Sequence, residues 1–384
     1  MKRKVCVAIT ARPSYSRIRT ALSAIRAHPE LELQLVVTAS ALLDRYGAAD
    51  RVIEAEGFRI DRRVYMIVEG ENLVTSAKST GFGLSELATV FDDLKPDMVI
   101  TIADRFETMA TAVAAAYMNI PLVHVQGGEV TGSIDEKVRH AITKLADLHL
   151  VASANAAQRV IRMGELPDRV HVTGCPSIDV AKQAIMSPMA TNDIFEAYGG
   201  VGPRLDLSNG YLVVMQHPVT TEHRAAREQI EETLAAVTAS GMPALWLWPN
   251  VDAGSALLAR GLRAGRERAR LDNIHFFKNL PPEEFLRVLN DCAAIVGNSS
   301  VAIRECAYLG VPAVNIGTRQ SGRDRGRNVM DVDYCRHQIL DAIRVCKSIG
   351  RFDGDDLYGD GNAGERVADV LAATPLETVK TLAY

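Results

Sequence analysis

Short apolar runs alternate with longer segments of helical periodicity along most of this chain, and this alternation restricts its fold more than any other feature. It is typical of βα units wound into parallel sheets, because a parallel strand is buried on both faces. In the first half the expected strands are 5–10, 33–38, 98–102, 122–125, 148–152 and 170–173. In the second half they are 211–215, 244–248, 275–277, 294–297 and 313–316. We therefore predict an α/β protein with parallel sheets.

A segment rich in glycine and proline separates the two series of strands. Residues 187–210 contain a density of helix and strand breakers that suits a link between domains: Pro188, Gly199, Gly200, Gly202, Pro203 and Gly210. We expect an N-terminal Rossmann-like domain at 1–186, the link at 187–210 and a C-terminal Rossmann-like domain at 211–366. The last residues, 367–384, are expected to form a C-terminal helix.

The composition argues against several classes of function. The 384 residues carry a net charge of −4, so there is no overall basic field for nucleic acid or an anionic membrane surface. The sequence has no signal peptide and no apolar stretch of about 18 residues, which leads us to expect a cytoplasmic protein. The six cysteines are far apart without a CxxC pair, which argues against a zinc site and against disulfides. Any anionic ligand must then be bound by local clusters of charge.

Three carboxylates follow expected strands of the first half, at the edge where ligands bind in open parallel sheets. Asp104 follows strand 98–102, and Glu129 and Asp135 follow strand 122–125. Carboxylates grouped beside a leaving diphosphate suit proton transfer at a sugar carbon. Each also has a plain structural explanation, since Asp135 suits the first turn of a helix and Asp104 can pair with Arg105 or another neighbour.

Residues at the ends of other expected strands suit a phosphate group. Asn298, Ser299 and Ser300 combine a helix-capping signal with two hydroxyls, where N–H groups and the positive end of the helix dipole favour an anion. Four basic residues also stand at strand ends, where a guanidinium can bind a diphosphate bidentately: Arg12, Arg105, His217 and Arg319. Plain capping and solvated surface charge remain alternatives for each residue alone. The absence of a Walker A loop and of GxGxxG after the first strand argues against Walker-type ATP hydrolysis and ordinary NAD binding.

Taken together, these segments resemble one known family, the hydrolysing UDP-N-acetylglucosamine 2-epimerases that open sialic acid biosynthesis in bacteria and animals. The similar segments run over nearly the whole chain: 104–106, 127–130, 139–145, 174–177, 216–221, 249–255, 297–300, 317–320 and 358–363. The resemblance implies the GT-B fold, in which two Rossmann-like domains face a cleft and a C-terminal helix commonly crosses back to the first domain. It implies a UDP-sugar substrate and no cofactor. We also expect a homodimer or higher homo-oligomer, with no nucleic-acid, membrane or metal partner.

The reaction that the resemblance implies has two stages. UDP is eliminated across C1 and C2 to leave a 2-acetamidoglucal, and water is then added while C2 is reprotonated on the other face, giving N-acetylmannosamine. The residues expected at the catalytic end are Asp104, Glu129, Asp135, Gln126, Arg139 and His124. Those expected to bind the nucleotide are Arg12, Ser16, Arg105, His217, Asn250, Asn298, Ser299, Ser300, Glu305 and Arg319, with Glu305 holding the ribose hydroxyls.

Three positions in the first half depart from the family pattern. Gln126 stands where the family usually carries a catalytic glutamate, and Ile102 and Ala41 stand where histidines are expected. The glutamine matters most, because an amide does not exchange a proton as a carboxyl group does. Three explanations are open: Glu129 or a histidine takes the role, the sugar differs, or one of the two stages is lost.

Two other functions are compatible with the same residues. A GT-B glycosyltransferase would use the same nucleotide site but would need an acceptor. A non-catalytic sensor of nucleotide sugars would explain the missing glutamate and histidines. We expect a hydrolysing 2-epimerase that acts on UDP-N-acetylglucosamine or on a modified 2-acetamido sugar.

Overall fold

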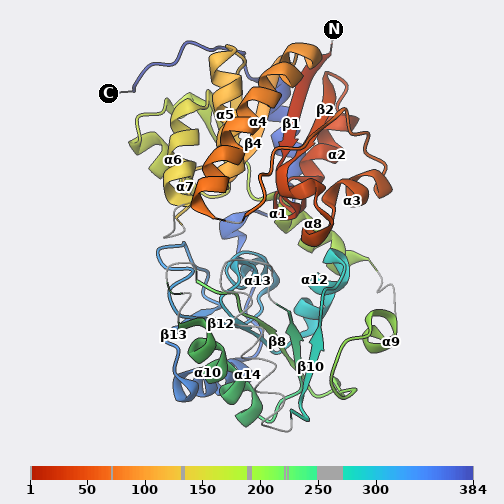
Figure 1. The fold of residues 1–384 in the computed structure, drawn as a ribbon. Helices are drawn as coiled ribbons and strands as arrows, with labels where there is room; N and C mark the ends of the chain where they lie inside the picture. Colours follow the sequence, from red (N-terminus) through yellow and green to blue (C-terminus); the bar gives the residue numbers. More distant parts are fainter. Residues whose placement is uncertain are drawn as a thin grey trace. The chain divides into compact units, whose positions relative to one another are not determined.

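The computed structural model describes residues 2–70, 72–130, 135–187, 193–219, 222, 225–248 and 271–383; the side chain of Asp135 lies outside this description. The contacts divide the chain into two compact units, drawn in Figure 1. Unit 1 consists of Met1–Val130, Ile134–Asp179 and Gly359–Tyr384, and unit 2 consists of Thr131–Ser133 and Val180–Tyr358. Each unit holds one parallel sheet, so the predicted two-part α/β fold is confirmed.

Unit 1 contains a seven-stranded parallel sheet with the order β3-β2-β1-β4-β5-β6-β7. Its strands are β1 Arg3–Ile9, β2 Leu31–Thr38, β3 Arg62–Val64, β4 Met98–Ile102, β5 Leu122–Val125, β6 Leu148–Val151 and β7 Val170–Val172. Strands β4, β5 and β6 are buried along their whole length, which explains their continuous apolar runs. Strand β3 was not predicted. It lies at the sheet edge and begins with two exposed arginines, so it has no apolar run.

Helices cover both faces of this sheet. The α-helices of unit 1 are α1 Arg12–Ser16, α2 Arg19–Ala27, α3 Ala49–Ala55, α4 Leu73–Leu94, α5 Phe106–Tyr117, α6 Asp135–Leu145, α7 Ala154–Arg162, the first turn of α8 Pro176–Met186, and α15 Ala363–Ala373. Short 3-10 turns are η1 Ala39–Leu42, η2 Asp44–Tyr46 and η3 Pro167–Arg169. Leu22 of α2, Ile53 of α3 and Leu371 of α15 belong to the core on one face, and Leu87 of α4 and Ile142 of α6 belong to the core on the other.

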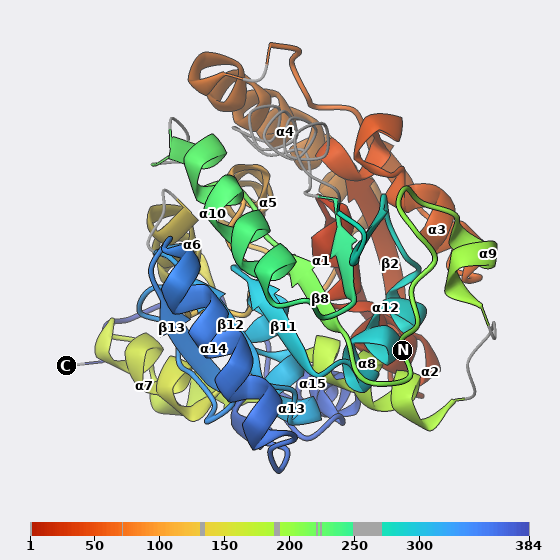
Figure 2. The ribbon, with the colours of Figure 1, turned by 90° about the horizontal axis from the view of Figure 1, so that it is seen from below.

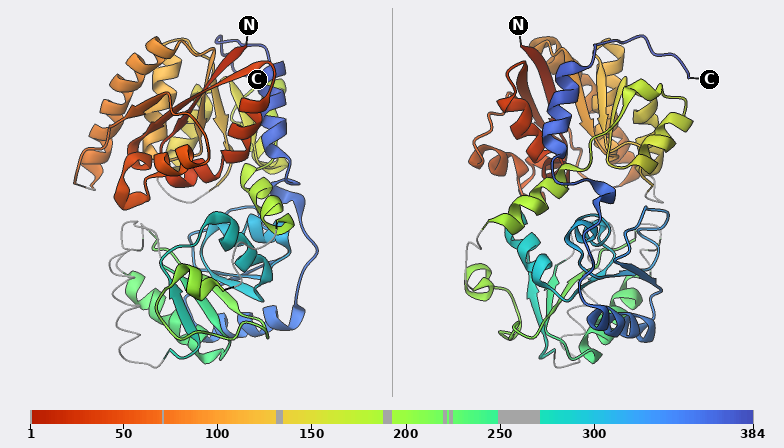
Figure 3. Two further views of the ribbon diagram at one scale, coloured as in Figure 1. Left: turned by 90° about the vertical axis from the view of Figure 1, so that its right-hand side faces the viewer. Right: turned by 180° about the vertical axis from the view of Figure 1, so that it is seen from behind.

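A carboxylate of unit 1 holds the start of the C-terminal helix α15. Asp179 on α8 accepts hydrogen bonds from the backbone nitrogens of Ala363 (2.9 Å) and Gly364 (2.7 Å), which lie in the first turn of α15. The Thr20 hydroxyl of α2 donates to the same carboxylate at 2.8 Å. The helix start thus has acceptors for its free N–H groups. Figure 3 shows α15 running beside α2.

Unit 2 contains a six-stranded parallel sheet with the order β10-β9-β8-β11-β12-β13. Its strands are β8 Leu212–Met215, β9 Ala244–Leu247, β10 Ile274–Phe277, β11 Ala294–Gly297, β12 Ala313–Ile316 and β13 Val329–Val332. Strand β13 was not predicted. It is a partly exposed edge strand that contains Asp331, so the apolar signal of a buried strand is weak.

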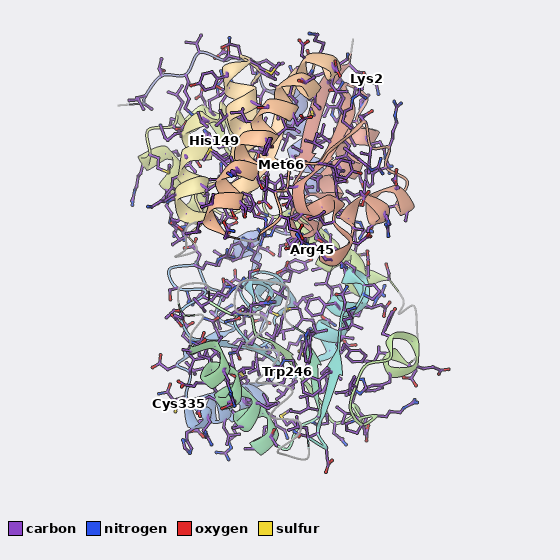
Figure 4. The ribbon with its side chains drawn as sticks, in the orientation of Figure 1. Lys2, Arg45, Met66, His149, Trp246 and Cys335 are labelled. Carbon is purple, nitrogen blue, oxygen red and sulfur yellow. The ribbon has the colours of Figure 1, made fainter. Side chains whose placement is uncertain are left out.

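The helices of unit 2 also cover both faces of their sheet. They are α9 Ile194–Tyr198, α10 Ala226–Ala239, α12 Pro282–Asp291, α13 Glu305–Leu309 and α14 Arg336–Ile349, with 3-10 turns η5 Ser300–Ala302 and η6 Asp356–Tyr358. Helices α10 and α14 lie side by side over one core (Figure 2), and Leu289 of α12 belongs to the core on the opposite face. Trp246 of β9, labelled in Figure 4, is fully buried in this sheet. Among the described residues no helix is both long enough and apolar enough to cross a membrane.

Candidate active site

Two strained residues mark the carboxyl edge of the unit 1 sheet. Ala103 follows β4 with a φ of 63°, and Gln126 follows β5 with a φ of 66°. Residues with a side chain rarely adopt this left-handed conformation, and such residues tend to persist where surrounding contacts fix them. Asp104 comes directly after the first of these turns, and Glu129 comes three residues after Gln126.

His124 of β5 fixes the first of these turns. Its Nε2 lies 2.9 Å from the carbonyl oxygen of Ala103, and its Nδ1 lies 3.1 Å from the hydroxyl of Thr143. Burial lowers the pKa of His124 to about 3, so the ring is neutral near pH 7. Since only a donor can face the carbonyl, Nε2 carries the proton and Nδ1 accepts from Thr143. Both ring nitrogens are thus engaged, and the residue acts here as a support for Ala103.

Arg139 of α6 faces two carboxylates at this edge. One guanidinium nitrogen forms an ion pair with Asp104, and Nη1 lies 3.6 Å from Oε2 of Glu129. The exposed fractions are 1% for Arg139, 8% for Asp104 and 4% for Glu129. Asp104 therefore pairs with Arg139 and not with Arg105, whose guanidinium binds Glu107 of its own helix at 3.1 Å. The structure thus brings one guanidinium and two carboxylates together in a buried group at this edge.

Gln126 contributes an amide to the same edge. Its Nε2 donates to the sulfur of Cys175 at 3.1 Å, and that sulfur lies 3.1 Å from the Ser177 hydroxyl. The amide oxygen is buried and finds no hydrogen-bond partner among the residues that the structure describes. A buried acceptor of this kind costs about 1–3 kcal/mol if it stays unpaired. The arrangement suits an acceptor for a hydrogen-bond donor on a ligand.

Arg12 and Ser16 were expected to bind the nucleotide. They are the first and last residues of the short helix α1 in unit 1. The Ser16 hydroxyl donates back to the carbonyl of Arg12 at 3.3 Å. Gly47 lies against the Arg12 side chain, where an added Cβ would stand 2.8 Å from Nη1. Arg105 also belongs to unit 1, and the other nucleotide candidates with described side chains belong to unit 2.

Asn298 organises the corresponding edge of unit 2. Its Nδ2 donates to the His217 carbonyl at 2.8 Å, and its Oδ1 accepts from the His217 backbone nitrogen at 2.7 Å. Its own carbonyl accepts from Arg319 Nη1 at 3.2 Å and from Gln320 Nε2 at 2.9 Å. Burial, followed by the charge of Arg319, lowers the pKa of His217 to about 3. The structure thus brings His217, Asn298 and Arg319 together, around a neutral imidazole.

Ser299 and Ser300 stand at the start of a short 3-10 turn. Ser299 is the N-cap of η5, and its hydroxyl accepts from the Val301 nitrogen at 3.4 Å. Because η5 has three residues and α13 has five, the helix dipole here is small. Any anion at this edge would depend on N–H groups, hydroxyls and Arg319. Glu305 begins α13, and its Oε2 is buried with no partner in the described part of the chain.

Two of the expected site residues are not placed. Asn250 and the side chain of Asp135 lie outside the described residues. Within the described ranges, no group of three or more His, Cys, Asp or Glu side chains is arranged to hold a metal ion.

Comparison with known proteins identifies the family. The model of a family described as UDP-N-acetylglucosamine 2-epimerase matches residues 23–372. This chain belongs to the UDP-N-acetylglucosamine 2-epimerase family. The UDP-N-acetylglucosamine 2-epimerase of Neisseria meningitidis serogroup B is 32% identical over 374 residues, which cover 97% of this chain and 95% of the relative. The UDP-N,N'-diacetylbacillosamine 2-epimerase (hydrolyzing) of Legionella pneumophila is 32% identical over 378 residues, 98% of each chain.

Solved structures agree on the fold. The crystal structure of UDP-GlcNAc 2-epimerase from Neisseria meningitidis bound to UDP-GlcNAc gives a TM-score of 0.80 at 17% identity. The alignment covers 97% of this chain and 100% of that chain. The architecture of this UDP-N-acetylglucosamine 2-epimerase family member is therefore GT-B-like.

Three polar residues around this family member's site were not singled out from the sequence: Thr143, Cys175 and Gln320. Thr143 supports His124, Cys175 accepts from Gln126, and Gln320 donates to Asn298. Each lies inside one of the segments that carried the family resemblance. Their place in these segments could have marked them as site residues. Their hydrogen-bond partners could not be read from the sequence, because each partner comes from a distant part of the chain.

Proposed function

We propose that this family member is a hydrolysing 2-epimerase that converts a UDP-activated 2-acetamido sugar, such as UDP-N-acetylglucosamine, into UDP and the free 2-epimer. The observation that carries this proposal is the buried group in which Arg139 faces Asp104 and Glu129. Removal and return of a proton at a sugar carbon needs positioned carboxyl groups, and a guanidinium keeps them in a fixed geometry.

The chemistry consumes one water. In the first stage a carboxylate takes the proton from C2, a double bond forms between C1 and C2, and UDP departs with the electron pair of its bond to C1. In the second stage the water oxygen bonds to C1 and a proton returns to C2 on the opposite face. We assign the proton transfers at C2 to Asp104 and Glu129, and the family resemblance adds Asp135.

The contacts of the histidines support Glu129 as the replacement for the family glutamate. Both ring nitrogens of His124 are engaged by protein atoms, and His149 donates to the buried Glu165 at 3.0 Å. His124 therefore has no ring nitrogen left to exchange a proton with a sugar, and the fully buried His149 is bound to Glu165 through its Nε2. Gln126 would instead position the sugar, since its amide oxygen can accept from a hydroxyl or an amide N–H.

The nucleotide end of the substrate is assigned to unit 2. Arg319 would supply charge-assisted hydrogen bonds to the diphosphate, and the Ser299 and Ser300 hydroxyls would add neutral ones. The buried carboxylate oxygen of Glu305 suits the donor hydroxyls of a ribose.

The hydrolytic outcome and the sugar rest on the relatives. The Legionella relative is similar over 98% of its length. Its name describes a hydrolyzing enzyme and a sugar with two acetyl groups. The Neisseria relative is named for UDP-N-acetylglucosamine. Both sugars are therefore the first substrates to test.

The test is incubation of the protein with each UDP-sugar in deuterated water, without any acceptor, followed by phosphorus and proton NMR. We expect UDP and free sugar in equal amounts, with deuterium at C2. An epimerised sugar that still carries UDP would contradict hydrolysis. Turnover that appears only after addition of an acceptor sugar would identify a glycosyltransferase instead.

A second candidate function follows from Gln126. If the protein lacks the second stage because an amide stands where the family has a carboxyl group, it would release UDP and accumulate the unsaturated glycal. The same NMR spectra distinguish this outcome, because the glycal has a vinyl proton and no free 2-epimer would form.

A further inference from the structure

The segment after α15 is held on unit 1 by specific contacts although it forms no helix or strand. Arg3 donates to the Thr374 carbonyl at 2.9 Å, Arg169 donates to the Pro375 carbonyl at 3.0 Å, and the Ala383 nitrogen donates to the Gly164 carbonyl at 3.1 Å. Val379 is 86% exposed and Leu382 is 56% exposed, whereas the Lys380 side chain between them is 24% exposed. The segment thus turns a charged side chain inward and leaves apolar ones in solvent, the reverse of the usual preference.

Lys380 caps the end of helix α6. Its Nζ donates to the carbonyl of Thr143 at 3.3 Å and to the carbonyl of Ala146. Carbonyls in the last turn of a helix have no partner within the helix, so a lysine from elsewhere that satisfies them fixes the helix end. The third contact of Nζ is an ion pair with Glu165. All three ammonium protons therefore have acceptors.

Glu165 joins three elements in a buried charge cluster. It is 3% exposed, and besides Lys380 it accepts from Lys144 of α6 at 2.6 Å and from His149 of β6 at 3.0 Å. Burial by itself would raise the pKa of Glu165, but hydrogen bonds from His149, Lys144 and Lys380 hold it at about 2. Glu165 therefore stays ionised at neutral pH; Figure 4 labels His149, which donates to it.

Two short routes lead from Lys380 to the proposed catalytic group. Along α6, the helix that Lys380 caps carries Arg139, which pairs with Asp104 and Glu129. The second route passes through Thr143. Its carbonyl accepts from Lys380, its hydroxyl donates to His124, and His124 in turn donates to the carbonyl of Ala103. Both routes run entirely within unit 1.

We propose that Lys380 is a positioning residue for the reaction: by capping α6 and binding Glu165 it sets the place of Arg139 and Thr143, and through them the orientation of Asp104. This proposal rests on the proposed function for its kinetic consequence. Its structural part, the fixing of α6 by Lys380, is independent of the substrate.

The test compares Lys380→Met with Lys380→Arg and with the control Glu377→Gln. Glu377 is an exposed residue of the same segment whose ion pair is with Arg169, so its loss loosens the segment without uncapping α6. For Lys380→Met we expect kcat to fall about tenfold to a hundredfold, as small displacements of catalytic groups do, with KM and UDP affinity changed less than about twofold. Lys380→Arg should recover a large part of kcat, and Glu377→Gln should keep the wild-type value.

Hydrogen exchange of the α6 amides is measured on the same proteins. Lys380→Met should exchange faster in α6 than the wild type, while Glu377→Gln should not. If Lys380→Met keeps the wild-type kcat, or if Glu377→Gln loses as much kcat as Lys380→Met does, the proposal is overturned. If the wild type turns over neither UDP-sugar, the proposed function has failed, and α6 exchange alone decides the proposal for Lys380. Should Lys380→Met fail to fold, Lys380→Gln gives the same comparison with an uncharged donor.

Discussion

Asn298 holds the main chain of His217 through two hydrogen bonds, one donated to the His217 carbonyl and one accepted from its nitrogen, at 2.8 and 2.7 Å. The residues are 81 positions apart and follow the neighbouring strands β11 and β8. The Asn298 carbonyl also accepts hydrogen bonds from the side chains of Arg319 and Gln320. One buried amide residue therefore fixes three loops at the edge assigned to the nucleotide.

Replacing Asn298 with leucine should destabilise the protein. The change keeps the volume but leaves the buried N–H and C=O of His217 without partners, which at about 1–3 kcal/mol for each group gives a loss of about 2–6 kcal/mol. Urea unfolding followed by circular dichroism measures the change. A loss below about 1 kcal/mol would show that water or another group replaces the amide.

Replacing Arg319 with alanine should weaken UDP binding about tenfold to a hundredfold, because a charge-assisted hydrogen bond to the diphosphate is lost. Calorimetric titration with UDP measures the affinity. Arg344→Ala is the control, since that arginine of α14 is exposed and pairs with Asp341 on its own helix. Unchanged affinity in both Arg319→Ala and Ser299→Ala would remove these residues from the nucleotide site.

Replacing Asp104 with asparagine should lower turnover by about a hundredfold or more while UDP affinity stays nearly intact, as expected for a group that transfers a proton. The asparagine keeps the shape of the side chain facing Arg139 but does not take up a proton. Steady-state release of UDP gives kcat, with the exposed Asp168→Asn as a control in the same unit. Equal losses of kcat and UDP affinity would point to a binding role.

Changing Gln126 to glutamate tests the role of the amide. If the amide only positions the sugar, the wild type already gives C2-deuterated free sugar in deuterated water, and the variant changes rate or sugar preference. If the wild type accumulates glycal and the variant forms the free sugar, the carboxyl group supplies the missing second stage. Proton NMR separates the two results. Finding neither product from any nucleotide sugar tested would contradict both roles.

Stability should fall as the pH drops from about 6.5 toward 5. Burial lowers the pKa of His124 and of His217 to about 3, and it also lowers the pKa of His149. In the unfolded chain His124 and His217 take up protons below about pH 6.5, while in the native protein they do not, so the free energy of unfolding decreases; the lowered pKa of His149 acts in the same direction. The expected slope is about 1 kcal/mol for each histidine and each pH unit.

Urea unfolding at several pH values above about 5 measures this slope before most carboxylates titrate. His337→Gln, at an exposed histidine of α14, serves as a control for the substitution itself. A free energy of unfolding that stays flat across this range would mean that the buried rings are protonated in the native protein.

The sequence by itself determined the α/β class, the central strands and the edges where the functional residues stand. Strands such as β4 and β5 are buried on both faces, so their apolar runs are a local property that can be read directly. Asp104 and Glu129 could be placed near each other because parallel strands end at one edge. The edge strands β3 and β13 escaped prediction because an exposed strand needs no apolar run.

Only the tertiary structure decided which groups pair. Asp104 had a possible partner next to it in Arg105, yet its charge is met by Arg139 of α6. Lys380 and Glu165 are 215 positions apart, and His124 of β5 reaches Ala103 at the end of the neighbouring strand β4. Such contacts depend on how helices pack on the sheet, and no local pattern of residues carries that information. Local sequence therefore fixes which residues stand at the edge of the sheet, and packing fixes what each of them contacts.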